Sequence, residues 1–358
     1  MEETIKAEIF NPDFFKDKRN SLYICAAGFE DRTLGIVRHL KEERFTYSLI
    51  FEYITQKEEN EPNLKILKNS LKKLSDKKPL ISPADPDNPL ATQQNLVERL
   101  KSIPKENITH VFIDISVMTN SLILQTLSDV NRLFWDKTLY VLYTEAESYY
   151  PTKEEGKEIY KSIKKEDIEK LGTIFSSSGA KETFILPDFK GKIKDYLPIC
   201  LIFFVGYEPI RSRGLIEQYC PNLVIACYGE SPHNKFKWRS DFSRKIHKEV
   251  FKNYPHIDSK NINNEDLSTF EITDILKKLE RIYSSFYENY NICITPQCSK
   301  LQAVATYLFT LTYPDVQILF CLPGSFNPKR YSKGIGTSYV INLFSYMYSI
   351  YNYNHMSK

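Results

Sequence analysis

The chain has 358 residues, more than one ordinary domain needs and enough for two. Hydrophobic residues make up 42% of it and charged residues 26%, a normal globular balance that lets each domain bury a core. Lys and Arg number 48 against 45 Asp and Glu, and the resulting net charge of +3 excludes the large basic excess of proteins that act chiefly by binding nucleic acid.

Apolar runs of strand length alternate with segments of helical periodicity in the first part of the chain. We expect strands at 21–27, 47–53, 110–116 and 139–144, and helices at 30–40, 64–74, 92–100 and 121–133. Alternating strands and helices favour a parallel sheet with helices on both faces.

Residues 152–195 differ from this pattern. The stretch 153–170 predicts a charged helix, and 176–180 (SSSGA) predicts a flexible turn, so we interpret the whole segment as a connector. A second series then follows, with strands expected at 199–205, 223–227, 291–295 and 316–322, and helices at 236–251, 267–287 and 301–311. The Tyr-rich tail 338–353 should pack back on the sheet.

Two polar turns recur in both halves. AAGFEDR from Ala26 and FVGYEPIRSR from Phe204 each place Gly, an aromatic residue, Glu and then Arg after a strand. DISVMTNS from Asp114 corresponds in position to ITPQCSK from Ile294. The spacing is nearly equal, 92 residues from Gly28 to Asn120 and 94 from Gly206 to Lys300. Internal duplication explains this, so we expect two tandem Rossmann-like α/β units, 1–151 and 196–358, each with a parallel central sheet.

These turns are the candidate ligand sites. Ligands of open parallel sheets bind beyond the carboxyl ends of the strands, where the strand order reverses. Gly28 and Gly206 would permit a sharp turn, and the arginines that follow would lie near a helix N-terminus, which favours an anion. The two glutamates, Glu30 and Glu208, would repel phosphate, so they would bond a ribose hydroxyl or base amine, pair with Arg, or cap a helix.

DISVMTNS, which follows a strand and opens a helix, resembles the D-hydrophobic-T-G-G-T-K-S turn of CARF-type nucleotide-sensing domains. Asp114, Thr119 and Ser121 match that pattern, whereas Ser116 replaces its first Thr and Asn120 its Lys. Val117 and Met118 stand where the family has two glycines. In the second half QCSK retains the Lys as Lys300 and has Ser299 in place of the Thr, but it lacks the Asp and the glycines. The resemblance implies a cytoplasmic sensor of cyclic oligoadenylate or a related nucleotide, in prokaryotic antiviral defence.

Two further polar segments belong to the second half. YGESPHNKFKWRSDF, residues 228–242, mixes an aromatic ring with cations, which together could stack on a base and hold a phosphate. Residues 323–336 form a Gly-rich, basic loop that could close over an anion. Either segment could equally be a solvated surface loop. The complete set of expected ligand-binding residues is Gly28, Glu30, Arg32, Asp114, Thr119, Asn120, Gly206, Glu208, Arg211, Arg213, Trp238, Arg239, Ser299, Lys300 and Arg330.

The leading hypothesis is a nucleotide-binding sensor or regulatory module that holds its ligand between the two repeats, with a protein of a defence system as a possible partner. An alternative is an enzyme that cleaves a nucleotide or nucleic-acid phosphodiester, with Glu30 or Glu208 as acid or base and Lys300 and Arg239 stabilising charge. A non-catalytic interaction scaffold is the third possibility.

Cofactors, metals and membranes are not expected. The sequence has no P-loop, no GxGxxG and no zinc-ligand spacing, so we expect neither a cofactor nor a metal. The chain has seven cysteines, an odd number, and no CxxC motif, which favours reduced thiols. We see no signal-peptide core and no run of about 18 apolar residues, and therefore expect a cytoplasmic protein without a membrane partner.

Overall fold

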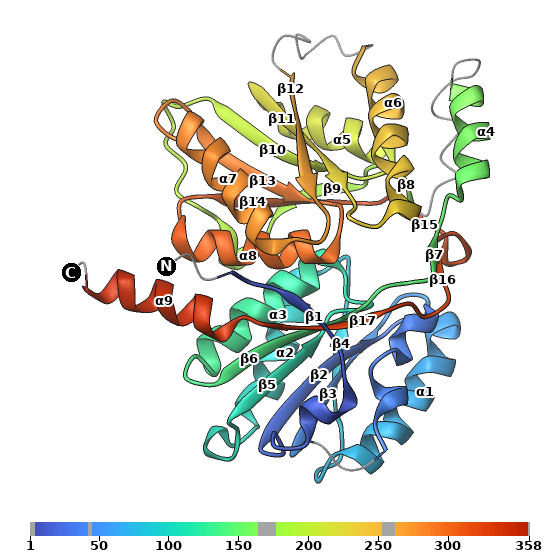
Figure 1. The fold of residues 1–358 in the computed structure, drawn as a ribbon. Helices are drawn as coiled ribbons and strands as arrows, with labels where there is room; N and C mark the ends of the chain where they lie inside the picture. Colours follow the sequence, from blue (N-terminus) through green and yellow to red (C-terminus); the bar gives the residue numbers. More distant parts are fainter. Residues whose placement is uncertain (1–3, 42–44, 164–176, 253–261, 357–358) are drawn as a thin grey trace. The chain divides into compact units, whose positions relative to one another are not determined.

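The computed structural model describes residues 4–41, 45–163, 177–252 and 262–356 (Figure 1). The chain forms two compact units. The first consists of Met1–Ser148 and Ser332–Lys358, and the second of Tyr149–Tyr331. Each unit has a central sheet of mostly parallel strands with helices packed on it, which confirms the expected α/β fold of two tandem Rossmann-like units.

The first unit is built on a seven-stranded sheet. Its strands are β1 (Ala7–Ile9), β2 (Ser21–Ala27), β3 (Tyr47–Tyr53), β4 (Leu80–Ala84), β5 (His110–Asp114), β6 (Thr138–Thr144) and β17 (Ser338–Asn342). Its helices are α1 (Lys57–Leu74), α2 (Pro89–Lys101), α3 (Asn120–Leu133) and α9 (Phe344–Met356). The order in the sheet is β1-β17-β6-β5-β2-β3-β4. Strands β2 to β6 are parallel, whereas β17 runs antiparallel to β6 and β1 antiparallel to β17.

The second unit repeats this arrangement in a six-stranded sheet. Its sheet strands are β9 (Glu182–Ile185), β10 (Ile199–Val205), β11 (Leu223–Glu230), β12 (Ile262–Ser268), β13 (Asn291–Pro296) and β14 (Gln317–Leu322). Its helices are α4 (Lys153–Ile163), α5 (Pro209–Tyr219), α6 (Trp238–Lys252), α7 (Ile272–Phe286) and α8 (Lys300–Thr312). The order is β12-β11-β10-β13-β14-β9, with β9 antiparallel to β14.

In the described part of the chain, four two-residue strands lie outside the two large sheets. They are β7 (Ser148–Tyr149), β8 (Ser177–Ser178), β15 (Ser325–Phe326) and β16 (Ser332–Lys333), and β8 pairs with β15 in the second unit. The large sheets match strand for strand, because β2, β3, β4, β5 and β6 occupy the positions of β10, β11, β12, β13 and β14. The duplication seen in the polar turns therefore extends to the topology of both sheets.

Each sheet buries a continuous apolar core. The central strands β2 and β10 are buried along nearly their whole length, as expected for parallel strands covered on both faces. In the first unit, α1 places Leu64, Leu67 and Leu71 on one face of the sheet at helical spacing. Helices α2 and α3 contact each other, as α7 and α8 do in the second unit.

The segment 30–40 is not the expected α-helix. It forms two short 3₁₀ turns, Asp31–Leu34 and Val37–His39, with hydrogen bonds such as Gly35 N–H to Arg32 C=O at 3.0 Å. Gly35 and the neighbouring β-branched residues have low helix propensity. Gly35 also packs directly against the Thr144 side chain, so the chain follows the sheet there.

The helix expected at residues 267–287 starts later in the structure than the sequence predicted. Residues 262–268 form β12, an edge strand parallel to β11, and α7 starts at Ile272. The Ser268 hydroxyl accepts hydrogen bonds from the backbone N–H groups of Phe270 and Glu271, which turns the chain before the helix. The sequence of β12, INNEDLS, is too polar to indicate a strand. The edge strand β4 was also not predicted, because it contains Pro83.

The boundaries of the units differ from the expected ones at both ends of the second unit. The tail 332–358 belongs to the first unit, because β17 pairs with β6 over five residues. The segment 152–195 was expected to be a connector, but its described parts belong to the second unit, where α4 contacts α6 and β9 extends the sheet. The rest of the expected helix 153–170, from residue 164 on, lies outside the described residues. Within the described residues no helix is long and apolar enough to cross a membrane.

Candidate functional site

In both units the strand order reverses between the first and fourth parallel strands, β2 and β5 in the first unit and β10 and β13 in the second. The turns after these strands lie at the point where ligands of such sheets bind. We call residues 28–33 with 116–121 rim 1, and residues 206–213 with 297–302 rim 2. Each rim is assembled within one unit, and the two can be compared position by position.

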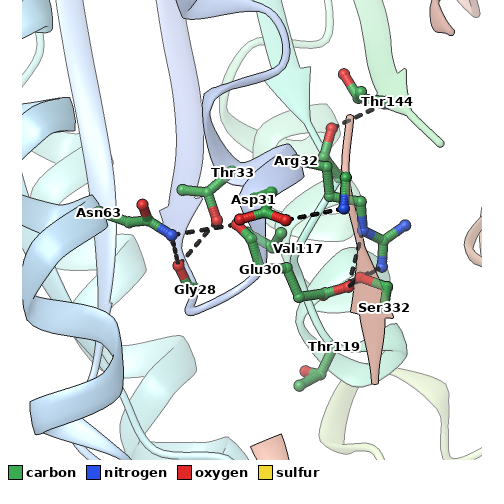
Figure 2. Close-up of polar contacts among 12 residues, drawn as sticks. Gly28, Glu30, Asp31, Arg32, Thr33, Asn63, Val117, Thr119, Thr144 and Ser332 are labelled. Carbon is green, nitrogen blue, oxygen red and sulfur yellow. Dashed lines mark hydrogen bonds and ion pairs between the residues drawn. The ribbon is translucent and has the colours of Figure 1, made fainter. Parts of the chain in front are cut away.

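In rim 1 the two charged side chains, Arg32 and Glu30, bind each other (Figure 2). Arg32 donates from Nε to Glu30 Oε2 at 2.9 Å and from Nη2 to Glu30 Oε1 at 3.1 Å. Both side chains are only 4% exposed, and the Ser332 hydroxyl adds a hydrogen bond to Glu30 Oε2. A bidentate guanidinium–carboxylate pair uses the geometry that would otherwise hold a phosphate. Nε and Nη2 of Arg32 therefore bind Glu30 and not an anionic ligand.

The space above Gly28 is filled. A Cβ atom placed on Gly28 would lie 3.1 Å from Cβ of Val117, a buried residue of the second turn of rim 1. The Gly28 carbonyl oxygen accepts hydrogen bonds from Thr33 Oγ1 at 2.9 Å and from Asn63 Nδ2 at 2.8 Å (Figure 2). Val117 and Met118 are both buried. Apolar packing thus replaces the open approach that the expected phosphate site requires.

A tyrosine hydroxyl bridges the second turn of rim 1. Tyr53 Oη donates to the Val117 carbonyl oxygen at 3.1 Å and accepts from the Thr119 N–H at 3.0 Å. The Thr119 side chain caps α3 by accepting from Leu122 N–H at 3.2 Å, and half-buried Asn120 is the first residue of that helix. The Thr119 N–H is therefore satisfied within the protein, as is usual for buried backbone donors.

Asp114 lies below the surface of rim 1. Its carboxylate accepts from Tyr23 Oη at 2.8 Å, from Ser116 N–H at 3.0 Å and from the Ser116 hydroxyl. Burial raises the pKa of Asp114 above its usual range, and these hydrogen bonds oppose the rise. The Asp114 carboxylate therefore ties β5 to β2 and supports the turn from beneath.

In rim 2 the glutamate caps a helix. Glu208 accepts from Ile210 N–H at 3.2 Å and from Arg211 N–H at 2.7 Å, and so satisfies the first free donors of α5. This occupies the helix N-terminus that was expected to attract an anion. Burial raises the pKa of Glu208 to about 7, although Arg211 and the backbone donors oppose the rise. The carboxyl is thus only partly ionised near neutral pH.

The arginine of rim 2 is held differently from Arg32. Arg211 donates from Nε to the Cys321 carbonyl oxygen at 2.7 Å, at the end of β14, and stays half-buried. This bond orients the guanidinium, whose two terminal nitrogens carry four further N–H donors. Arg213, two residues later, is exposed and pairs with Glu217 at 2.8 Å on the surface of α5. Of these two arginines of rim 2, Arg211 is the one that is both oriented and close to the reversal point.

The second turn of rim 2 keeps polar groups at its surface. Ser299 caps α8 in a capping box with Gln302, and its hydroxyl donates to the Thr269 carbonyl oxygen at 2.7 Å. Lys300 is the first residue of α8 and is half-buried, as are Gly206 and Gln297. A Cβ atom on Gly206 would meet only the Gln297 carbonyl oxygen, at 3.3 Å. Among the residues that the structure describes, rim 2 therefore lacks the apolar cover that closes rim 1.

The aromatic-cation segment 228–242 has a structural role in the second unit. Arg239 is 6% exposed, and its guanidinium donates to Tyr207 Oη at 2.8 Å and to the carbonyl oxygens of residues 149, 150 and 151. It also lies 4.2 Å from the centre of the Tyr207 ring. The Trp238 ring packs on Gly156 of α4 and on Phe242. Arg239 thus clamps the chain before α4.

Arg330, in the basic loop 323–336, lies 3.7 Å from Glu155 in a half-exposed ion pair. The structure also contains site residues that the sequence analysis missed, chiefly Tyr53, Ser332 and the Cys321 carbonyl. Tyr53 carried a weak signal, because it ends a strand next to the reversal point. Ser332 and Cys321 carried none, since their contacts depend on chain crossings between distant segments.

No protein-family model matches the chain, and no curated protein sequence matches it. The solved structures that resemble it include two of low identity. One is a type III CRISPR defence DNA nuclease activated by cyclic oligoadenylate, with 9% identity, a TM-score of 0.43 and 81% of this chain covered. This chain spans 64% of that nuclease's length. The other is the precorrin-6A reductase CobK, with 7% identity, a TM-score of 0.22, and 80% of this chain and 83% of that chain covered. Likenesses at this level assign no function to this chain.

Proposed function

We propose that this protein is a nucleotide sensor that binds the phosphate of its ligand at rim 2, while rim 1 has become structural. The single observation that carries the proposal is the contrast between two arginines at equivalent turns. Arg32 is buried in a bidentate pair with Glu30, whereas Arg211 is half-buried and oriented by one backbone carbonyl. A guanidinium held in this way can offer two parallel N–H donors to a phosphate.

Lys300 supports the same site. It opens α8 at the second turn of rim 2, where the CARF-type turn also has a lysine. A lysine at the start of a helix adds a point charge for the phosphate without fixing its geometry. The resemblance of both turns to those of CARF-type domains makes cyclic oligoadenylate the first ligand to test, and a role in antiviral defence the corresponding biological proposal.

Isothermal titration calorimetry with cyclic tetraadenylate, AMP and inorganic phosphate tests the proposal. Arg211→Gln should weaken nucleotide binding about ten- to hundredfold, because a hydrogen bond to a charged group contributes about 1.5–3 kcal/mol. Arg213→Gln is the matched control, since Arg213 lies on the same helix and pairs with Glu217 at the surface. Equal affinities of the two variants for every nucleotide that the wild type binds would contradict the assignment, and so would a wild type that binds none.

One observation favours a second candidate, an enzyme that cleaves a phosphodiester. Glu208 has a pKa near 7 beside Arg211, as a general acid or base at neutral pH requires. Against this, both of its oxygens accept backbone hydrogen bonds at the start of α5. Incubating cyclic oligoadenylates and single-stranded nucleic acids with the wild type and Glu208→Gln, followed by chromatography, separates the candidates. Products formed by the wild type and lost in the variant would favour the enzyme.

A further inference from the structure

The strand that completes each sheet does not follow the fifth parallel strand of its own unit. In the first unit β17 pairs with β6, but β17 comes after β14 of the second unit. In the second unit β9 pairs with β14, but β9 comes after β6 of the first unit. In a simple tandem duplication β6 would pair with β9 and β14 with β17. The chain exchanges the two strands instead.

Matching local structure precedes the two exchanged strands. Ser177–Ser178 and Ser332–Lys333 each form a two-residue strand that ends at a glycine. These glycines, Gly179 and Gly334, have φ angles of +73° and +77°, a conformation that favours glycine over residues with a Cβ. We call residues 177–185 arm 1 and residues 332–342 arm 2. Because both arms contain this glycine turn, we interpret the exchange as reciprocal and as part of the internal duplication.

Each arm also contacts the first connection of the unit that it completes. In arm 2 the Ser332 hydroxyl donates to Glu30, and the Gly334 N–H donates to Asp31 Oδ2 at 2.8 Å. In arm 1 Ala180 packs against Gly214 of α5 so closely that a Cβ on Gly214 would overlap it. The arms therefore bind two elements, the neighbouring strand and the segment after the first strand.

Arm 2 is a paired and buried part of the first unit. Its strand β17 pairs with β6 on one side and with β1 on the other. Tyr339, Val340 and Ile341 are 7%, 6% and 0% exposed. Removal of this strand would expose these side chains and the edge of β6 together, so the first unit depends on a segment that the chain reaches only after completing the second.

We propose that the chain is the fused form of an arm-exchanged pair, in which arm 1 and arm 2 are reciprocal docking segments and the two units fold and unfold as one cooperative body. The partner that each arm fits is the open edge of the opposite repeat, at β14 for arm 1 and β6 for arm 2. The proposal is independent of the ligand proposed for rim 2, because it rests on strand pairing alone.

A disulfide trap in the full chain tests the exchange. Tyr140 and Asn342 face each other in a pair without mutual hydrogen bonds, where Cα atoms are close enough for a disulfide. Oxidised Tyr140→Cys/Asn342→Cys should yield the 140–342 cross-linked peptide in mass spectrometry, from protein that stays monomeric on a non-reducing gel. Tyr140→Cys/Ser349→Cys, with the second cysteine on exposed α9, is the control and should yield little. A missing 140–342 peptide, or one that joins two chains, would overturn the exchange within one chain.

The two tryptophans of the chain test the cooperativity, because Trp135 lies in the first unit and Trp238 in the second. Trp135 stacks on Tyr351 of α9 at 5.3 Å, so its fluorescence reports on the segment that continues arm 2. Trp238→Phe and Trp135→Phe each leave one reporter. Ile341→Ala should lower the urea midpoint of both reporters equally. Glu8→Ala, at an exposed position of β1, the strand that pairs with β17, should leave both nearly unchanged.

If Ile341→Ala does not fold, Ile341→Val takes its place with a smaller common shift. Two separate midpoints in the parent variants, or a shift of the Trp135 midpoint alone, would show that the units unfold independently and would overturn the proposal.

Discussion

The Tyr53 hydroxyl accepts a hydrogen bond of 3.0 Å from the backbone N–H of Thr119 and donates one of 3.1 Å to the carbonyl oxygen of Val117. A single phenol thus holds the turn that would have to receive a phosphate in the first unit. In rim 2 the corresponding turn is stabilised by a capping box, which leaves its half-buried polar residues at the surface. The repeats share a topology but have diverged at this point.

Tyr53→Phe should destabilise the protein by about 1–3 kcal/mol, because it leaves the buried Val117 carbonyl and the half-buried Thr119 N–H without their common partner. Urea unfolding followed by circular dichroism measures the change. Tyr47→Phe, on the same strand and half-buried, is a suitable control and should change the free energy of unfolding by less than about 0.5 kcal/mol. Equal effects of the two substitutions would argue against the bridging role of Tyr53.

The Glu30–Arg32 pair should behave as a buried ion pair in a double-mutant cycle. Glu30→Gln or Arg32→Met alone should cost about 3–5 kcal/mol, because each leaves a buried charge without its partner. The double variant should cost clearly less than the two losses together. Free energies of unfolding from urea titrations give the coupling. Additive losses would show that the two side chains act separately.

The packing of Val117 on Gly28 predicts a rescue. Gly28→Ala should destabilise the protein by about 1–3 kcal/mol through overpacking, because the new methyl group would lie 3.1 Å from Cβ of Val117. Val117→Ala removes the Val117 Cγ2 atom, which would lie 3.2 Å from the same methyl group, and should recover part of that loss when combined with Gly28→Ala. Gly206→Ala, whose new methyl group meets only a carbonyl oxygen at 3.3 Å, should cost less. Thermal unfolding of the four variants tests the order.

The free energy of unfolding should depend on pH through Glu208 and His247, and the effects of these two side chains should have opposite signs. The buried His247 has its pKa lowered to about 4, so between about pH 4 and 6.5 the unfolded chain binds a proton that the folded protein does not, and stability falls as pH falls. Glu208 has its pKa raised to about 7, so between about pH 4.5 and 7 the folded protein holds a proton that the unfolded chain has released. Its contribution therefore decreases as pH rises.

Glu208→Gln removes the second effect only. Relative to the wild type, its free energy of unfolding should rise by about 3 kcal/mol from pH 4.5 to pH 7.5, since one pKa unit corresponds to about 1.4 kcal/mol. His247→Gln should gain relative stability in the opposite direction, as pH falls from 6.5 to 4. Urea unfolding at four pH values gives both slopes. A constant difference between Glu208→Gln and the wild type would mean that the Glu208 carboxyl titrates normally in the folded protein.

Much of the fold follows from the sequence, because continuous apolar runs such as 21–27 and 199–205 can only be buried strands in a chain of this pattern. The polar edge strands β4 and β12 gave no such pattern. The candidate turns were also found at the reversal points, since their position depends only on strand order. What those turns do was not predictable, because whether Arg32 or Arg211 meets a carboxylate depends on side-chain geometry. It also depends on arm 2, which supplies Ser332, a residue 302 positions from Glu30 in the sequence.

Hydrogen-exchange mass spectrometry of the full chain with saturating cyclic tetraadenylate tests the central claim most directly. The account predicts slower exchange at residues 206–213 and 297–302, where the ligand would bind rim 2, and unchanged exchange at residues 28–33 and 116–121 of rim 1. Protection of rim 1 without rim 2, or of neither rim under conditions where calorimetry detects binding, would contradict it.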